Sequence, residues 1–206
     1  MNDIKMIENA SCKVETMDVL SPYSSLIDKI DSMVQKKSII LAIDGGCGSG
    51  KTTLADRLQK RYDCNVFHMD DFFLQPHQRT KERFEEVGGN VDRERFLEEV
   101  LIPLKNGEDV HYRRFDCKSF TILPEVIMKP KEINIIEGSY SMHPLLADYY
   151  DFGVFLEIDS MLQKKRIEER NSPELTQRFF ETWIPMEEKY HKDMKVKERC
   201  SLWFII

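Results

Sequence analysis

The amino-acid sequence predicts an α/β fold, with a five-stranded parallel sheet between two layers of helices. Apolar runs of strand length alternate with helical patterns along the chain, and one strand–helix junction is rich in glycine. Strands that alternate with helices form parallel sheets with both faces covered, which predicts a three-layer α/β/α architecture. The expected strands are residues 39–43, 65–69, 133–136, 153–158 and 202–206.

The length and composition suit one domain. The chain has 206 residues, of which 41% are hydrophobic, so it can bury a substantial core. Ser21 and Pro22 mark a helix start ahead of the first strand. We therefore expect an N-terminal extension and helix over residues 1–37 and the main domain over residues 38–206.

Charge and cysteine content exclude several classes of protein. A net charge of −6 does not favour a nucleic-acid partner. The five cysteines are an odd number with no C-x-x-C pair, which disfavours both a disulfide framework and a zinc site. No apolar stretch approaches membrane-spanning length. These features predict a cytoplasmic protein without membrane or nucleic-acid partners; a homo-oligomer remains open.

The clearest motif lies in residues 39–53, which read IILAIDGGCGSGKTT. Gly45, Gly50, Lys51 and Thr52 fit the phosphate-loop pattern G-x-x-x-x-G-K-[ST], and a strand and a helix flank it in the required order. The residues expected to surround a bound nucleotide in this segment are Gly45, Gly46, Cys47, Gly48, Ser49, Gly50, Lys51, Thr52 and Thr53.

The chemistry of this loop suits a nucleoside triphosphate. Glycines let the backbone approach an anion, and the amides and the helix dipole then face the phosphates. Lys51 would reach the β- and γ-phosphates, and the Thr52 hydroxyl would bind Mg²⁺. The alternative is a plain glycine turn with a solvated lysine. The guanine-reading N-K-x-D motif is absent, which counts against a GTPase. The expected cofactors are ATP and Mg²⁺, and GTP as the donor stays an open alternative.

Carboxylates follow two further strands. Asp70 and Asp71 end the second strand, and Glu137 ends the third. Ligands of parallel sheets bind beyond the carboxyl ends of the strands, so these acids would share one crevice with Lys51. An Asp there suits a base that accepts a proton, although an Asp pair also caps turns. The following Phe72 and Phe73 suit a binding wall or the core.

Three other segments complete the pattern. Residues 74–90 are polar and predict a long mobile connection, residues 92–106 predict a helix, and residues 110–123 predict a hairpin or loop pair. None of the five histidines stands out as catalytic.

A basic helix follows the fourth strand. Residues 164–170 are rich in Lys and Arg, and such runs are usually solvated helix faces. Arg166 and Arg170 nevertheless share an i, i+4 face and would reach the phosphates if this helix formed a lid. Both interpretations remain open, and residues 173–194 predict further helix.

The order GGCGSGKTT, HMDDFF, IIEGSY and RIEER resembles the uridine kinase and phosphoribulokinase family, which includes nicotinamide riboside kinases. The resemblance extends over about residues 38–206. It implies a P-loop kinase fold with a helical lid. It also implies that Asp70 accepts the proton of a sugar hydroxyl and that Glu137 assists Mg²⁺. Arg166 and Arg170 would contact the triphosphate.

The resemblance also implies where the acceptor binds. Family members hold the nucleoside with aromatic and acidic residues after the base, which here are Asp71, Phe72, Phe73, Phe115 and Asp116. Uridine kinases generally have a Tyr-Asp-Phe segment and then a His, whereas this chain has Phe115-Asp116-Cys117 and Phe120. The expected function is γ-phosphate transfer from ATP to a hydroxyl of a uridine-, cytidine- or nicotinamide riboside-like nucleoside. The alternatives are a kinase for a non-nucleoside sugar or metabolite, and an ATPase or nucleotide switch acting on a protein partner.

Overall fold

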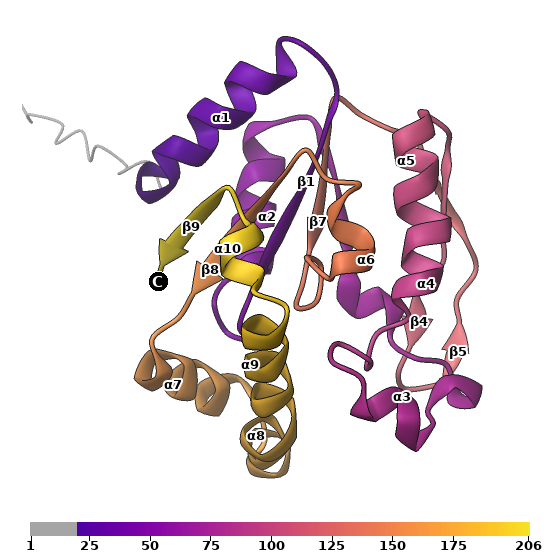
Figure 1. Ribbon diagram of the computed structural model, residues 1–206, viewed down its shortest axis with the longest axis vertical. Coiled ribbons are helices and arrows are strands. Elements are labelled where there is room, and N and C mark those ends of the chain that lie inside the picture. Colours follow the sequence, from indigo (N-terminus) through magenta and orange to yellow (C-terminus); the bar gives the residue numbers. More distant parts are fainter. Residues whose placement is uncertain (1–19) are drawn as a thin grey trace, which may run out of the picture.

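The computed structural model describes residues 20–206, so most of the predicted N-terminal extension lies outside the described residues. Its centre is a five-stranded sheet in the order β2-β7-β1-β8-β9, and every neighbouring pair is parallel (Figure 1). The strands are β1 (Ile39–Gly45), β2 (Cys64–His68), β7 (Ile133–Glu137), β8 (Phe152–Glu157) and β9 (Leu202–Ile205). The predicted sheet is confirmed.

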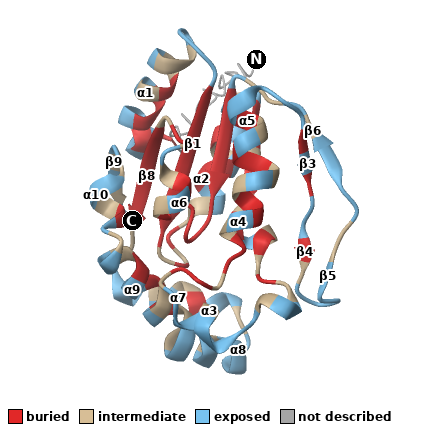
Figure 2. Cartoon of the chain, turned by 45° about the vertical axis from the view of Figure 1, so that its right-hand side comes forward, coloured by how far each residue is buried: buried red, intermediate tan, exposed pale blue. Residues whose placement is uncertain are grey.

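Each face of the sheet has its own hydrophobic core, because successive strand residues point to opposite faces. Along β1, Ile39, Leu41 and Ile43 pack in one core, together with the helices before and after that strand. Ile40 and Ala42 pack in the other core, against the helices of residues 93–106 and the C-terminal helices. Every residue of β1 is buried (Figure 2). The two cores explain the three-layer α/β/α architecture.

The helices are mostly short. They are α1 (Ser24–Val34), α2 (Lys51–Arg61), α3 (Lys81–Glu85), α4 (Arg93–Phe96), α5 (Ile102–Asn106), α6 (Pro144–Ala147), α7 (Ser160–Arg170), α8 (Pro173–Arg178), α9 (Ile184–Asp193) and α10 (Val196–Arg199). Several of them, among them α3, α6 and α10, lie outside the segments predicted to be helical. Two π-helical stretches, η4 (Leu97–Leu101) and η5 (Phe179–Trp183), join α4 to α5 and α8 to α9. The 3₁₀ segments are η1 (Ser21–Tyr23), η2 (Met69–Phe72) and η3 (Pro76–Gln78).

The helix predicted over residues 92–106 has the expected ends. The side chain of Asp92 accepts a hydrogen bond from the Arg95 amide and caps the first turn. Gly107 ends the helix with a left-handed φ of 73°. The predicted hairpin region contains two antiparallel pairs, β3 (Val110–Tyr112) with β6 (Val126–Met128) and β4 (Phe115–Asp116) with β5 (Thr121–Ile122).

The predicted mobile connection over residues 74–90 is instead a folded segment. It contains η3 and α3, and the Arg83 side chain ties it together. The guanidinium donates hydrogen bonds of 2.9 Å to the carbonyls of Gly89 and Val91 and pairs with Glu94 at 2.6 Å. Composition alone suggested a loop because few residues of this segment are apolar, although Leu74 is buried and Val87 packs against the core.

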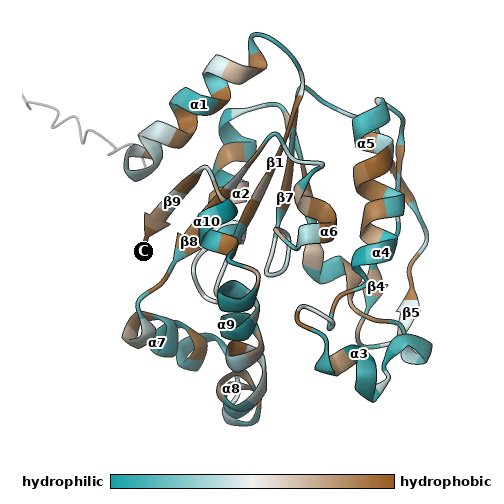
Figure 3. Cartoon of the chain, in the orientation of Figure 1, coloured by the Kyte–Doolittle hydropathy of each residue, from teal (hydrophilic) through white to brown (hydrophobic). Residues whose placement is uncertain are grey.

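Residues 160–193, comprising α7, α8, η5 and α9, form a helical unit that we call the lid. These helices lie together at one end of the molecule (Figure 1). Many residues of α7 and α9 are hydrophilic, whereas the central strands are largely hydrophobic (Figure 3). A small apolar cluster of Cys47, Ile167 and Ile184 joins the lid to the loop after β1.

No helix within residues 20–206 is long and apolar enough to cross a membrane.

Candidate active site

The loop between β1 and α2, residues 45–52, has the backbone that a phosphate loop requires. Gly50 precedes α2 with a φ of 92°, a conformation that costs glycine little and other residues more. A Cβ on Gly45 would lie 2.3 Å from the backbone oxygen of Leu156, so β8 leaves no room for a side chain there. The glycines of the motif are therefore required by the local geometry.

Lys51 begins α2 and folds back over the loop. Its Nζ donates to the carbonyl oxygens of Gly45 at 2.7 Å and Gly46 at 3.1 Å. It also donates to Ser139 Oγ at 3.2 Å, in the turn after β7. The ammonium group therefore lies between the loop and the end of the neighbouring strand, where an anion bound by the loop would meet it.

Thr52, Glu137 and His68 form a group beside Lys51. The strand register places His68 opposite Glu137 at the carboxyl ends of β2 and β7. Thr52 Oγ1 lies 3.2 Å from both carboxylate oxygens of Glu137, and His68 Nδ1 lies 2.5 Å from Glu137 Oε1. The bond to Glu137 raises the pKa of His68. His68 is a site residue that the sequence analysis missed, although it lies directly before the Met-Asp-Asp segment.

Asp70 lies in η2, immediately beyond β2, where the residue is accessible to solvent while protein atoms surround its carboxyl group. Desolvation by the surrounding protein raises the pKa of its carboxyl group, with a further contribution from Glu137, while Lys51 acts in the opposite direction. Asp70, Lys51 and Glu137 thus interact electrostatically, at the edge of the sheet where the carboxyl ends of the strands meet.

The two residues after Asp70 have packing contacts of their own. Asp71 accepts a 2.7 Å hydrogen bond from the buried Tyr112 hydroxyl. Phe72, predicted to contact the acceptor, is fully buried and packs edge-to-face on Phe96. We correct that expectation, because a side chain with no exposed surface offers none to a ligand. Phe73 is partly exposed and pairs with Val91 through a β-bridge.

The β4–β5 hairpin lies against η2, and the sequence analysis took Phe115 and Asp116 there as acceptor residues. Phe115 is buried. The carboxylate of Asp116 caps the hairpin turn, accepting a 2.7 Å bond from Ser119 Oγ and two bonds from backbone amides. The exposed aromatic side chain at the turn is Phe120, whose φ of 56° is unusual for a residue other than glycine. Arg79 lies over its ring, 5.1 Å from the centroid.

The two lid arginines differ. Arg166 donates a 2.8 Å hydrogen bond to the carbonyl of Gly48 and therefore touches the phosphate loop. Arg170 packs over the ring of Phe179, 5.4 Å from its centroid. Lys164 and Lys165 pair with Glu168 and Glu169 on the exposed side of α7. One side of α7 is therefore exposed to solvent, and the other side contacts the phosphate loop through Arg166.

Three further buried side chains lie at the site: Ser139 and Glu187, from segments distant in the sequence, and Asp44, directly before the loop. Glu187 in α9 contacts the Cys47 amide, and Ser139 lies between Glu187 and Lys51. Asp44, the last residue before the loop, accepts hydrogen bonds from the Met142 amide and the Tyr190 hydroxyl, both at 2.8 Å. Asp44 could have been identified as a candidate site residue from the sequence, because it is a charged residue at the end of an otherwise apolar strand.

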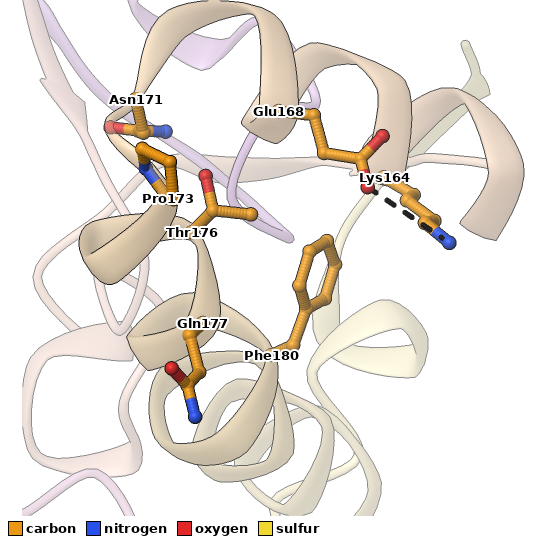
Figure 4. A pocket seen from close by; sticks show the side chains of 7 residues that line it. All are labelled: Lys164, Glu168, Asn171, Pro173, Thr176, Gln177 and Phe180. Atoms are coloured by element: carbon orange, nitrogen blue, oxygen red, sulfur yellow. Dashed lines mark ion pairs between the residues drawn. The ribbon is translucent and has the colours of Figure 1, made fainter.

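A separate open hollow lies on the lid between α7 and α8 (Figure 4). Its lining includes the Lys164–Glu168 ion pair and Phe180, and contains no residue of the phosphate loop or of the Asp70 segment. The hollow is therefore not part of the candidate active site.

The residues present fit a magnesium nucleotide. Ser49 Oγ is buried in the loop and, among the described residues, has no hydrogen-bond partner. The Cys47 amide already donates a hydrogen bond to a protein carboxylate, so an amide of this loop can bind an anionic oxygen. Thr52 and Glu137 supply the oxygen ligands that Mg²⁺ prefers. Within residues 20–206, no cluster of three or more His, Cys, Asp or Glu side chains could hold a metal ion.

Strand order, loop and carboxylates together define a P-loop phosphotransferase with a hydroxyl acceptor. Residues 40–172 match the model of the Phosphoribulokinase / Uridine kinase family, and the chain belongs to that family. The uridine kinase of Staphylococcus aureus is 31% identical over 150 residues, covering 68% of this chain and 71% of that enzyme. The family membership that the four sequence motifs indicated is confirmed.

Solved structures support the fold. A protein from Bacillus stearothermophilus described as a possible uridine kinase has a TM-score of 0.63 and 23% identity, covering 87% of this chain and 99% of its own. A candidate fructose transport system kinase from Silicibacter sp. TM1040 has a TM-score of 0.61 and 19% identity, covering 88% and 96%. At these identities the likeness concerns the fold alone.

Proposed function

We propose that the protein transfers the γ-phosphate of ATP, with Mg²⁺, to a hydroxyl group of a nucleoside-like substrate. The observation behind this proposal is the position of Asp70: an acidic residue accessible to solvent beyond β2, within electrostatic reach of Lys51 and Glu137. Family membership supports phosphoryl transfer to a small molecule, and the identity to uridine kinases favours a nucleoside.

The side chains divide the work of phosphoryl transfer. Asp70 would accept the proton of the acceptor hydroxyl as the oxygen attacks phosphorus. Lys51 and Arg166 would hold the phosphates and balance the charge that develops on them. Thr52 and Glu137 would hold Mg²⁺, which neutralises phosphate charge when bound. Tyr112 keeps Asp71 engaged, which leaves Asp70 as the free carboxylate of the pair.

A second candidate acceptor is a non-nucleoside sugar or metabolite. The hairpin beside η2 presents an exposed phenyl ring, Phe120, with Arg79 stacked on it. A polar side chain that reads a pyrimidine rejects analogues strongly, whereas an apolar ring does so weakly. This wall therefore suits a broader or different range of acceptors than the Tyr-Asp-Phe and His arrangement of uridine kinases.

A panel of acceptors would test the proposal. Purified protein with Mg-ATP would be incubated with uridine, cytidine, nicotinamide riboside, ribose and fructose, and ADP release and phosphorylated product would be measured together. We expect acceptor-dependent ADP release with one nucleoside, and a sugar in its place would favour the second candidate. ADP release that no acceptor changes but another protein stimulates would reject both candidates.

A further inference from the structure

The phosphate loop is in contact with a carboxylate from the far end of the chain. The Cys47 amide, in the middle of the loop, donates a 2.7 Å hydrogen bond to Glu187 Oε2. Glu187 belongs to α9 and is 7% exposed, so the contact is shielded from water. Amides of such loops ordinarily donate to phosphate oxygens. A carboxylate oxygen is the side-chain group that most closely resembles one.

The second oxygen of the same carboxylate is also engaged. Glu187 Oε1 accepts a 2.7 Å hydrogen bond from Ser139 Oγ, and Ser139 Oγ in turn lies 3.2 Å from Lys51 Nζ. Both groups that would serve a phosphate, the Cys47 amide and the Lys51 ammonium, are thus linked to Glu187, directly or through one hydroxyl. Two converging hydrogen bonds hold the carboxylate in a single orientation.

The Ser139 hydroxyl separates the Glu187 carboxylate from the Lys51 ammonium. Within residues 20–206, Glu187 forms no ion pair. It interacts electrostatically with Asp70, and Asp70 also interacts with Glu137. A polyphosphate in the loop would add several negative charges to this group of carboxylates. Repulsion between buried charges is strong because water screens it weakly. The triphosphate and the Glu187 carboxylate therefore cannot both occupy this part of the loop at low energy.

The helix that bears Glu187 is firmly anchored. Tyr190, one turn later on the same face, is fully buried and donates a 2.8 Å hydrogen bond to Asp44 Oδ2. At the start of the helix, Ile184 packs with Cys47 and Ile167. Gln163 of α7 donates to the Cys47 carbonyl at 2.9 Å, and Arg166 donates to that of Gly48. The contact is thus one part of a lid that packs closely on the loop.

We propose that Glu187 competes with the nucleotide polyphosphate for the Cys47 amide, so that this lid residue sets nucleotide affinity. Binding of the polyphosphate expels the carboxylate while the Tyr190–Asp44 bond keeps the end of α9 in place. The contact between the lid and the phosphate loop therefore depends on whether a polyphosphate is bound in the loop. This inference uses one part of the proposed function, namely that the phosphate loop binds the polyphosphate of the nucleotide.

Calorimetric titration of the full chain with Mg-ATP, and separately with inorganic tripolyphosphate, tests this inference. The variants are Glu187→Gln, which removes the charge and keeps the shape, and Glu187→Ala, which removes both. Glu188→Gln is the matched control, because Glu188 is the exposed neighbour on the same helix. We expect both Glu187 variants to bind either ligand at least about tenfold more tightly than the parent chain, and the control to bind as the parent does.

Unchanged or weaker binding in the Glu187 variants would overturn the proposal and make Glu187 a support that shapes the loop. Failure of every variant to bind either ligand would overturn it too. A thermal melt confirms that each variant is folded, and Glu187→Ala decides if Glu187→Gln does not fold. Tighter ATP binding without phosphorylation of any acceptor would uphold this inference while rejecting the proposed function.

Discussion

The Tyr112 hydroxyl donates a 2.7 Å hydrogen bond to Asp71 Oδ2, and this bond distinguishes two adjacent carboxylates. Asp71 is tied to a buried side chain of the β3–β6 ribbon, whereas Asp70 is exposed beyond the end of β2. A carboxylate engaged with a neutral donor is a poor candidate for accepting a substrate proton. The two carboxylates thus differ: Asp71 is held by Tyr112, and Asp70 is the one that we propose as the base.

The first prediction concerns Asp70→Asn. The variant cannot accept the acceptor proton, so kcat should fall by about 10²- to 10⁴-fold, the usual contribution of a general base. Its dissociation constant for Mg-ATP should stay within about threefold, because Asp70 is assigned to the acceptor side. Steady-state kinetics measures kcat, and calorimetric titration measures the dissociation constant for Mg-ATP. Retained turnover would assign the proton transfer to another group.

The second prediction concerns pH. Asp70 acts as a base only when ionised, so activity is lost as pH falls through its pKa. Desolvation and the nearby carboxylates raise that pKa, so the loss should begin at a higher pH than for an ordinary aspartate. Asp71→Asn removes one of these charges and should move the acidic limb of the kcat/KM profile to lower pH. A shift to higher pH would contradict the proposed electrostatics.

The phosphate loop was predictable because its residues are close together in the sequence. Gly45, Lys51 and Thr52 lie within eight residues, and the strand-end rule brings Glu137 to the same edge without any three-dimensional information. Glu187 was not predictable, because it lies 140 residues from the Cys47 amide that it contacts. Helical periodicity marks its helix but says nothing about which loop that helix meets.

Aromatic residues illustrate a second limit. Phe72 and Phe73 are adjacent phenylalanines that the sequence does not distinguish. Phe72 is nevertheless fully buried, whereas Phe73 is partly exposed. The difference arises because η2 turns the chain just after β2, and no periodic pattern describes a single 3₁₀ turn. The same holds for Phe120, which is exposed by a hairpin turn with an unusual φ.

The third prediction follows from the burial of Phe72. Phe72→Ala deletes a ring that packs between Phe96 and the Arg95 guanidinium, which lies 4.0 Å from the ring centroid. The free energy of unfolding should fall by about 3–5 kcal/mol, as for other buried aromatics. Urea denaturation followed by circular dichroism measures it. Phe120→Ala, at an exposed site, is the matched control and should change stability by less than about 0.5 kcal/mol.

The fourth prediction separates the two faces of α7. Arg166 donates to the Gly48 carbonyl and would meet the phosphates, whereas Lys165 lies on the exposed face near Glu169. Arg166→Ala should raise the KM for ATP about tenfold, the value of one charge-assisted hydrogen bond, and should also lower kcat. Lys165→Ala should change neither by more than about twofold, because exposed i, i+4 pairs contribute little. Steady-state kinetics with varied ATP decides the matter: equal effects of the two substitutions would mean that the lid acts through its overall charge, and an unaffected Arg166→Ala enzyme would exclude this arginine from the nucleotide site.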